Sequence, residues 1–372
     1  RILVTGSRGK SGTVRLVAAA LAADRSTYAK ITGTAAREIF PDGTEVETRR
    51  IGATSTSELA HSLRRAAKAG ADTGVFECMA ITPSLIRMVQ RTHVQAQMVI
   101  IPAIRLDHLE EEGLSEVAIG RNIINAIDGC EVIVTGVDQL EVLDYFRTYC
   151  AEHDIRLVEV QSGPETPVVP GHHPTNVAIA FRVAEELGQD RDISLAAIRA
   201  ASLEPRAASL QRLSLDDGFT IDVVDLSGAN DPQSAWDAIR AIGFDHAPVV
   251  PVLVNRWERP LRTVSFFASF RGAYPVFGVM GTLSRWMATR HRLESYRLSR
   301  DHDESRYFRF TRQMADNPEL LAETIRGLVD TPDDRVIVLL LENTHDATAD
   351  RFRALLDRQA TQETVGQEVN GR

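Results

Sequence analysis

A short glycine-containing loop near the start of the chain has the residues of a phosphate-binding site. Gly6-Ser7-Arg8-Gly9-Lys10-Ser11-Gly12 follows an apolar run at residues 2–5 and opens a helix-like stretch that continues to residue 23. Glycines let backbone N–H groups approach phosphate oxygens, and a helix N-terminus adds partial positive charge. Lys10 can reach the β- and γ-phosphates of a nucleotide, and Ser11 can ligate Mg²⁺. Residues 6–12 are therefore a predicted nucleotide site, and a strand-turn-helix with a coincidental Lys-Ser pair is the competing interpretation.

The spacing inside this loop narrows the class of nucleotide-binding protein. The general Walker pattern has four residues between its first glycine and the Gly-Lys pair, whereas only Ser7 and Arg8 separate Gly6 from Gly9. This shortening points away from ordinary kinases and GTPases.

Acidic and imidazole side chains follow two other apolar runs. Glu77 ends the run at residues 73–77, and Asp107 and His108 come shortly after the run at residues 98–101. Ligands bind beyond the carboxyl ends of parallel strands, and a buried carboxylate is costly unless it is paired or bound to metal. We predict that Glu77 is a Mg²⁺ ligand, with an ion pair or helix cap as the alternative. His108 beside Asp107 is a candidate for a second cation site, with a satisfied loop histidine as the alternative.

Further loops carry hydroxyl groups and cations. The loop from Lys30 to Arg37 includes Thr32 and Thr34, and it could bind an anionic substrate or a phosphate; solvated loop residues are the alternative. In the second half, three arginines follow an apolar run, and guanidinium groups suit carboxylates and phosphates. These are Arg256, Arg259 and Arg262, with a surface ion-pair network as the alternative. Asn230 and Asp231 stand between a strand and a helix, where an N-cap is the simplest role.

Two α/β domains are expected to position these residues. Apolar runs typical of buried strands alternate with stretches of helical period, first over residues 2–201 and again over residues 219–359, which favours mostly parallel sheets covered by helices. A chain of 372 residues also exceeds the roughly 250 to 300 residues of a single core. Because Pro205 interrupts the helical pattern, we predict domains at residues 1–205 and 206–372.

Composition excludes several functions. The net charge of −9 and the pI of about 5.6 give no general attraction to nucleic acid or anionic lipid. Cys78, Cys130 and Cys150 follow no metal-type spacing, so buried thiols in a reducing, cytoplasmic setting are expected. No stretch approaches the ~18 to 20 apolar residues that span a bilayer. Residue 1 stands almost directly on a strand, so we expect that a native N-terminal extension is absent from this chain.

Taken in order, the motifs resemble those of the Mur ligase superfamily, and most closely its poly-γ-glutamate synthase branch. The resemblance runs from residue 2 to about residue 355. It rests on Gly6 to Ser11, Thr32-Gly-Thr-Ala-Ala-Arg37, Glu77-Cys-Met-Ala80, Asp107-His108, Asn230-Asp231 and Asn255-Arg256-x-x-Arg259.

The resemblance implies a fold and a reaction. The fold is a central P-loop ATPase domain with a mostly parallel sheet, followed by a smaller Rossmann-like α/β C-terminal domain. In the reaction, a substrate carboxylate attacks the γ-phosphate of ATP to form an acyl phosphate, and an amine displaces phosphate to leave an amide, ADP and Pi. Mapped by motif, Lys10 stabilises the transferring phosphoryl group, Ser11 and Glu77 hold one Mg²⁺, and His108 helps to hold a second. Nucleotide contacts are implied for Asn176, Arg212, Asn230 and Asp231, and substrate contacts for Thr32, Thr34, Arg37, Arg256 and Arg259.

Substrates and partners follow from the same resemblance. It implies glutamate and a growing γ-glutamyl chain as substrates, integral membrane subunits as partners, self-association, and a cytoplasmic location, peripheral at the inner face of the membrane. His173 stands where many Mur ligases carry an adenine-reading asparagine, and Glu342-Asn-Thr-His345 replaces a glycine-containing turn. Such departures leave two alternatives open. One is a diverged ligase that joins another amino acid or small-molecule acceptor, and the other is an ATP-binding regulatory protein without ligase activity.

Overall fold

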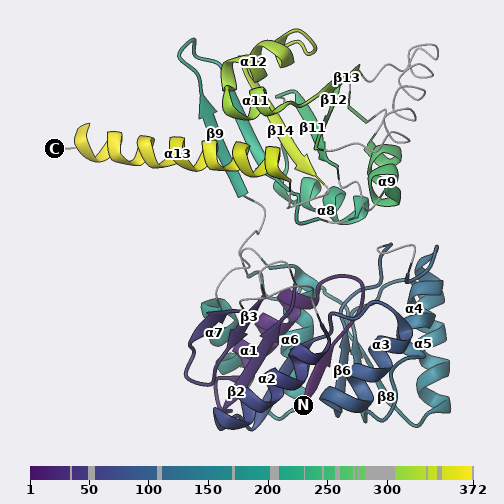
Figure 1. The fold of residues 1–372 in the computed structure, drawn as a ribbon. Helices are drawn as coiled ribbons and strands as arrows, with labels where there is room; N and C mark the ends of the chain where they lie inside the picture. Colours follow the sequence, from purple (N-terminus) through teal and green to yellow (C-terminus); the bar gives the residue numbers. More distant parts are fainter. Residues whose placement is uncertain are drawn as a thin grey trace. The chain divides into compact units, whose positions relative to one another are not determined.

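The computed structural model (Figure 1) describes the chain in segments. These are residues 1–33, 36–48, 55–106, 111–169, 172–201, 209–229, 231–244, 247–255, 260–270, 273–274, 276–281, 306–331, 334–341 and 346–370. By its internal contacts the chain divides into two compact units, Arg1–Pro205 and Arg206–Arg372.

The first unit is built on a mostly parallel sheet. Among its described residues the sheet has eight strands in the order β4-β3-β2-β5-β1-β6-β7-β8. Six are parallel, namely β1 (Ile2–Val4), β2 (Thr27–Ile31), β5 (Thr73–Glu77), β6 (Met98–Ile101), β7 (Val132–Thr135) and β8 (Arg156–Glu159). At one edge, β3 (Arg37–Ile39) and β4 (Glu45–Glu47) pair in the antiparallel sense. The central strands are buried on both faces, which explains their continuous apolar runs.

Helices cover both faces of this sheet, so the unit has three layers (Figure 1). On one face, α1 (Lys10–Leu21), α6 (Pro174–Glu186) and α7 (Arg191–Ala200) pack over Val4, Val75 and Val134. On the other face, α2 (Ser57–Lys68), α3 (Pro83–Met88), a π-helical turn at Val89–Val94, α4 (Glu116–Ile124) and α5 (Leu140–Glu152) pack over Leu3, Phe76 and Val99.

The second unit repeats the α/β principle on a smaller sheet. Among its described residues the strand order is β13-β12-β11-β14-β10-β9. The parallel strands are β10 (Thr220–Asp225), β11 (Val249–Val254), β12 (Val276–Met280), β13 (Arg306–Arg309) and β14 (Arg335–Leu341), while β9 (Ser209–Ser214) runs antiparallel to β10. One face carries α8 (Pro232–Ile242) and α9 (Pro260–Phe270), and the other carries α11 (Arg312–Asp316), α12 (Pro318–Arg326) and α13 (Ala347–Asn370).

The α/β fold class predicted from the alternating pattern is confirmed. The sequence did not indicate β3 and β4, because these strands are three residues long, polar, and paired at the sheet edge. Residues 282–305, which belong to the alternating pattern of the second half, lie outside the described residues. Within the described segments, no helix combines the length and apolarity needed to cross a membrane.

Candidate active site

The carboxyl ends of neighbouring parallel strands converge at one edge of the first sheet. β1 lies between β5 and β6, with Val4 opposite Glu77 on one side and Ile100 on the other. β2 lies on the far side of β5. The residues that follow β1, β2, β5 and β6 therefore meet at this edge, which is where ligands bind in open parallel sheets.

The glycine loop after β1 has the backbone of a phosphate cradle. Gly6 and Gly9 adopt φ angles of 124° and 76°, which favour glycine. A Cβ built at Gly9 would lie 2.9 Å from Asn176 Oδ1 and 3.1 Å from Pro102 Cβ, so a side chain has no room there. Gly9 also precedes the first residue of α1 without any side-chain cap. The first backbone N–H groups of α1 therefore face the loop, as phosphate binding at a helix N-terminus requires.

Lys10 lies against the backbone of its own loop. Its Nζ donates to Gly6 O at 2.6 Å and to Ser7 O at 3.4 Å. These contacts hold the ammonium charge beside the Gly6 and Ser7 carbonyls. The structure thus brings together the predicted loop residues 6–12, with Gly12 buried in the first turn of α1.

Glu77 and Ser11 form the polar centre of the site. Glu77 ends β5 and is 3% exposed. Ser11 Oγ donates to the Glu77 carboxylate, 3.0 Å from Oε1 and 3.1 Å from Oε2. The backbone N–H groups of Thr32 and Gly33 donate to Oε2 at 2.7 and 3.3 Å. The carboxylate is therefore fixed in orientation by three groups from two other segments.

Sequence reasoning missed part of this arrangement. The substrate contact implied for Thr32 stays a prediction. In the structure the Thr32 N–H donates to Glu77, and the Thr32 hydroxyl donates to Glu77 O at 3.5 Å, and neither contact was expected. Backbone donors leave no signature in the side-chain sequence. The glycine at position 33 is the available sequence signal of this close approach. A Cβ built there would lie 2.8 Å from Ser11 Oγ, so a larger residue does not fit without a shift.

The exit of β6 braces the phosphate loop. Ser7 N and Arg8 N donate to Ala103 O at 3.2 and 3.5 Å, and Arg105 N donates to Ser7 Oγ at 2.6 Å. Arg105 is in turn held by a bidentate ion pair with Asp138, at 2.8 and 3.0 Å. Asp107 and His108, which follow this segment, lie outside the described residues. The segment that leads to them is thus tied to the loop.

Asn176 approaches the same loop from α6. The helix begins at Pro174, and the His173 side chain accepts from Thr175 N at 3.3 Å. Asn176 Oδ1 is the atom that a Cβ at Gly9 would meet. Although 167 residues separate the two in sequence, the fold therefore places Asn176 beside the phosphate cradle.

The predicted loop from Lys30 to Arg37 divides into parts with different surroundings. Lys30 is on β2 and is 0% exposed, so the hypothesis that it is a loop cation available to substrate is wrong. Arg37 begins β3, and its Nε lies 3.4 Å from Glu45 Oε1. Glu45 also takes a bidentate pair from Arg15 of α1 at 2.8 and 2.9 Å. Thr34 lies outside the described residues.

Candidate residues of the second unit have structural contacts of their own. Arg212 on β9 makes a bidentate pair with Asp222 at 2.7 and 3.1 Å, and Arg335 Nε donates to the same carboxylate at 2.8 Å. Burial acts to raise the pKa of Asp222, but the two guanidinium groups outweigh it and lower that pKa. Asp231 caps α8 by accepting from Ser234 N at 2.9 Å. Asn230, Arg256 and Arg259 lie outside the described residues.

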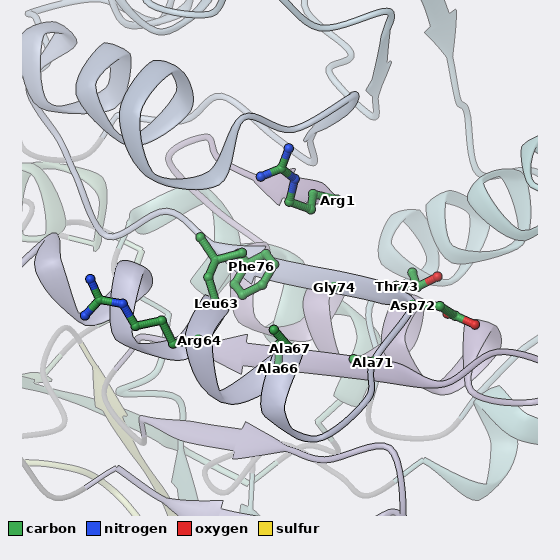
Figure 2. A pocket seen from close by; sticks show the side chains of 10 residues that line it. All are labelled: Arg1, Leu63, Arg64, Ala66, Ala67, Ala71, Asp72, Thr73, Gly74 and Phe76. Atoms are coloured by element: carbon green, nitrogen blue, oxygen red, sulfur yellow. The ribbon is translucent and has the colours of Figure 1, made fainter.

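A pocket of about 380 Å³ lies away from the carboxyl ends of β1, β2, β5 and β6. It is lined by residues of α2 and of the amino end of β5, among them Leu63, Ala67, Thr73 and Phe76 (Figure 2). Glu77 stands at the opposite, carboxyl end of β5. This pocket contains none of the predicted site residues.

The three cysteines are buried and unpaired with one another. Burial raises the pKa of Cys78, directly after Glu77, to about 11. Burial likewise raises the pKa of Cys130 to about 12 and that of Cys150 to about 11. The thiols are therefore protonated near neutral pH and poor nucleophiles.

The donor groups at the carboxyl ends of the central strands fit a nucleotide and a hard divalent cation. Among the residues that the structure describes, no cluster of three or more His, Cys, Asp or Glu side chains could hold a metal alone. Ser11 and Glu77 instead offer one hydroxyl and one carboxylate beside the phosphate cradle. Mg²⁺ is commonly bound by one or two carboxylates together with substrate phosphates, and this geometry suits that mode.

In comparisons with known proteins, each of the two parts of the chain matches the model of a known domain. The model of the Mur ligase middle domain matches residues 4–126, and the model of the poly-gamma-glutamate synthase CapB C-terminal domain matches residues 210–358. These matches agree with the resemblance to the Mur ligase superfamily that the motifs predicted. The second part of the chain is thus similar to the C-terminal domain of CapB.

Two relatives that are named CapB match a large part of the chain. The capsule biosynthesis protein CapB of Bacillus anthracis is 27% identical over 279 residues, which cover 72% of this chain and 59% of that protein. The PGA synthase CapB of Bacillus subtilis strain 168 is 25% identical over 278 residues, covering 72% of this chain and 70% of that protein. The chain thus matches less than two thirds of the Bacillus anthracis protein.

Solved structures share the fold. A folylpolyglutamate synthase of Mycobacterium tuberculosis complexed with ADP and AMPPCP has a TM-score of 0.63 at 16% identity, covering 95% of this chain and 90% of that one. A bifunctional folylpolyglutamate synthase/dihydrofolate synthase of Yersinia pestis complexed with AMPPNP and Mn ion has a TM-score of 0.64 at 18% identity, covering 95% and 88%. At these identities the likeness concerns the fold.

Proposed function

We propose that this protein is an ATP-dependent, ADP-forming amide ligase that synthesises or elongates poly-γ-glutamate. The observation that carries the proposal is the Ser11–Glu77 pair beside a glycine cradle, within a chain whose second part is similar to the C-terminal domain of CapB. Nucleotides in the related folylpolyglutamate synthase structures support ATP as the cosubstrate, and the Mn ion in one of them supports a divalent metal. Mg²⁺ is proposed because the donors are oxygens.

The residues of the first unit supply positioning and charge neutralisation. The N–H groups of the Gly6–Gly9 loop and of the first turn of α1 bind phosphate oxygens, and Lys10 neutralises charge that builds on the transferring phosphoryl group. Ser11 and Glu77 would hold Mg²⁺, which neutralises phosphate charge when bound. His108 is proposed as a ligand of a second cation.

The reaction has two steps, a phosphoryl transfer followed by an acyl transfer. A γ-carboxylate oxygen attacks the γ-phosphorus, ADP leaves, and an acyl phosphate forms. The amino group of the next glutamate then attacks the acyl carbon, loses a proton, and expels phosphate as the amide bond closes. Asn176, Arg212, Asn230 and Asp231 are proposed to contact the nucleotide, with Thr32, Thr34, Arg37, Arg256 and Arg259 on the substrate side.

Partners and location belong to the same proposal. Glutamate and a growing γ-glutamyl chain are the proposed substrates, because the relatives are named for capsule biosynthesis and PGA synthesis. Integral membrane subunits that export the polymer, self-association and a position at the inner face of the membrane are proposed alongside.

The test is ADP release with Mg²⁺-ATP and a panel of amino acids, followed by mass spectrometry of the products. We expect glutamate-dependent ADP and a ladder of products spaced by one glutamyl residue, and neither with Lys10→Ala. A product with another amino acid would indicate a diverged ligase. Tight ATP binding with no covalent product from any acceptor would indicate a regulatory ATP-binding protein.

A further inference from the structure

Lysine is rare in this chain, and one lysine is enclosed next to the proposed metal site. Of the 42 lysines and arginines, only Lys10, Lys30 and Lys68 are lysines. Lys10 is in the phosphate loop, and Lys68 is exposed at the end of α2. Lys30 is 0% exposed on β2. An enclosed ammonium is costly unless other groups compensate its charge and its N–H donors.

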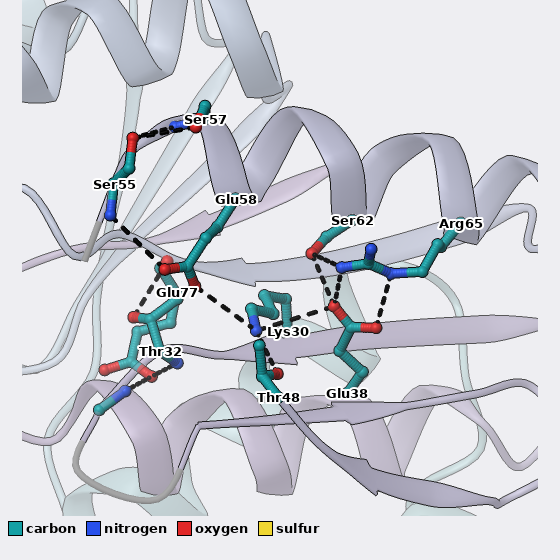
Figure 3. Close-up of polar contacts among 11 residues, drawn as sticks. Lys30, Thr32, Glu38, Thr48, Ser55, Ser57, Glu58, Ser62, Arg65 and Glu77 are labelled. Atoms are coloured by element: carbon teal, nitrogen blue, oxygen red, sulfur yellow. Dashed lines mark hydrogen bonds and ion pairs between the residues drawn. The ribbon is translucent and has the colours of Figure 1, made fainter. Parts of the chain in front are cut away.

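Lys30 reaches three oxygens from three different segments (Figure 3). Its Nζ donates to Thr48 Oγ1 at 2.5 Å, and it lies 3.7 Å from Glu38 Oε1 and 3.9 Å from Glu58 Oε2. Thr48 follows β4, Glu38 is on β3, and Glu58 is in the first turn of α2. The lysine therefore joins the edge hairpin to the helix that covers it.

The charges in this cluster are already matched. Glu38 accepts from Ser62 Oγ at 2.9 Å and from Arg65 Nε at 2.7 Å. Although burial opposes it, the pKa of Glu38 is lowered by Arg65, Ser62 and Lys30. Glu58 then balances the charge of Lys30. The shortest contact of Lys30, to the Thr48 hydroxyl, is thus a positional link between β2 and the chain after β4.

That link connects both ends of the loop that holds Glu77. Thr32 and Gly33, at the start of the loop, donate their N–H groups to Glu77 Oε2. Ala36, at its end, accepts from Thr48 N at 2.9 Å. Lys30 is on β2 and precedes Thr32, which follows the end of that strand, by two residues. Its ammonium holds Thr48. The lysine therefore fixes the separation between the two ends of the loop.

We propose that Lys30 is a positioning residue for the metal ligand Glu77. Through Thr48 and Ala36 it holds the Thr32–Gly33 backbone in the conformation whose N–H groups orient the carboxylate. The inference rests on the proposed function insofar as Glu77 is a metal ligand. Partners that orient a metal ligand typically change metal affinity about 10- to 100-fold when they are removed.

The experiment compares two charge-balanced double variants. Lys30→Met/Glu58→Gln removes the buried pair together, so that no lone carboxylate is left in the cluster. Lys68→Met/Glu131→Gln is the matched control, because it removes an exposed lysine and an exposed carboxylate and leaves the Lys30–Glu58 pair in place. Mn²⁺ binding is measured by electron paramagnetic resonance in the presence of a non-hydrolysable ATP analogue. Hydrogen exchange at the Thr32 and Gly33 amides is measured without metal or nucleotide.

We expect about tenfold weaker Mn²⁺ binding and faster exchange of both amides in the Lys30 variant than in the control. Affinity within twofold of the control would overturn the proposal, and so would equal losses of Mn²⁺ and metal-free nucleotide binding. If the double variant does not fold, Thr48→Val removes only the hydroxyl that Lys30 contacts, with the exposed Thr44→Val as its control. Unchanged Mn²⁺ affinity in Thr48→Val would likewise refute the link.

No glutamate enters this experiment, so its outcome is separate from that of the ligase assay. A wild-type protein that binds the analogue and Mn²⁺ but forms no amide would refute the proposed function and leave this inference to its own result. A wild-type protein that binds no Mn²⁺ with the analogue would overturn the role of Lys30.

Discussion

Replacing Glu77 with glutamine tests metal binding without disturbing the fold, because it changes one carboxylate oxygen to an NH₂ group. Both backbone donors point at Oε2, at 2.7 and 3.3 Å, and Ser11 Oγ lies 3.0 Å from Oε1. A glutamine carbonyl at the Oε2 position keeps both N–H donors, and its NH₂ group at the Oε1 position can donate to Ser11 Oγ. The shape and the hydrogen bonds are thus preserved, while the negative charge is lost.

The expected cost in stability is small. Hydrogen bonds to a charged acceptor contribute about 1.5–3 kcal/mol each and neutral ones about 0.5–1.5, so two weakened bonds cost roughly 2 kcal/mol before the relief of carboxylate desolvation. For a unit of this size, 2 kcal/mol lowers the melting temperature by about 4 to 8 °C at most.

The expected cost in activity is large. A divalent cation that stabilises phosphoryl charge contributes several kcal/mol, and a loss of about 4 kcal/mol slows the reaction about 10³-fold. Glutamate-dependent ADP release measures this loss, and a Mg²⁺ titration shows whether more metal restores the rate. Glu47→Gln is the control, since Glu47 is an exposed carboxylate on β4. Ligation within tenfold of the wild-type rate in Glu77→Gln would refute the role assigned to Glu77.

Three further predictions test other features of the structure. In an equilibrium binding assay, Gly9→Ala should weaken ATP binding at least tenfold, because its Cβ would meet Asn176 Oδ1. Gly70→Ala, at φ 72° in open space, is the control and should bind ATP as the wild type does. Equal losses in both variants would refute the role of Gly9 in phosphate binding. With a thiol reagent at pH 8, no thiol should react in the native protein and all three should react after unfolding; the cysteines are Cys78, Cys130 and Cys150. The pKa of Asp222 is lower in the folded protein than its ordinary value of 3.8. Ionised Asp222 therefore stabilises the folded state fully at pH values above 3.8, and this stabilisation is lost as the pH falls through the lowered pKa. The free energy of unfolding, measured by tryptophan fluorescence, should therefore fall less steeply with decreasing pH in Asp222→Asn than in the wild type over that acid range. An equal slope in the two proteins would contradict this.

The fold was predictable from the sequence because its strongest signals are buried. Parallel strands covered on both faces are continuous apolar runs, as in β1 and β6, and the helices between them show the helical period of apolar residues. Edge elements lack this signal. The β3–β4 hairpin is short and half-exposed, so nothing in its composition marked it.

The site was predictable only where side chains carry it. Ser11 and Glu77 were named from their places after β1 and β5, and the structure puts their oxygens in contact. The N–H groups of Thr32 and Gly33 escaped prediction because any residue type supplies a backbone donor. Lys30 was misplaced in a loop because its acidic partners come from β3 and α2, which only the tertiary fold brings to it.

The most direct test of the proposed reaction follows one oxygen atom. A γ-glutamyl chain and glutamate, both labelled with ¹⁸O in their carboxylates, are incubated with the protein, Mg²⁺ and ATP, and the released phosphate is analysed by mass spectrometry. An acyl phosphate carries one carboxylate oxygen to phosphorus, so one ¹⁸O atom should appear in the phosphate for each amide formed. Amide formation with unlabelled phosphate would contradict the mechanism.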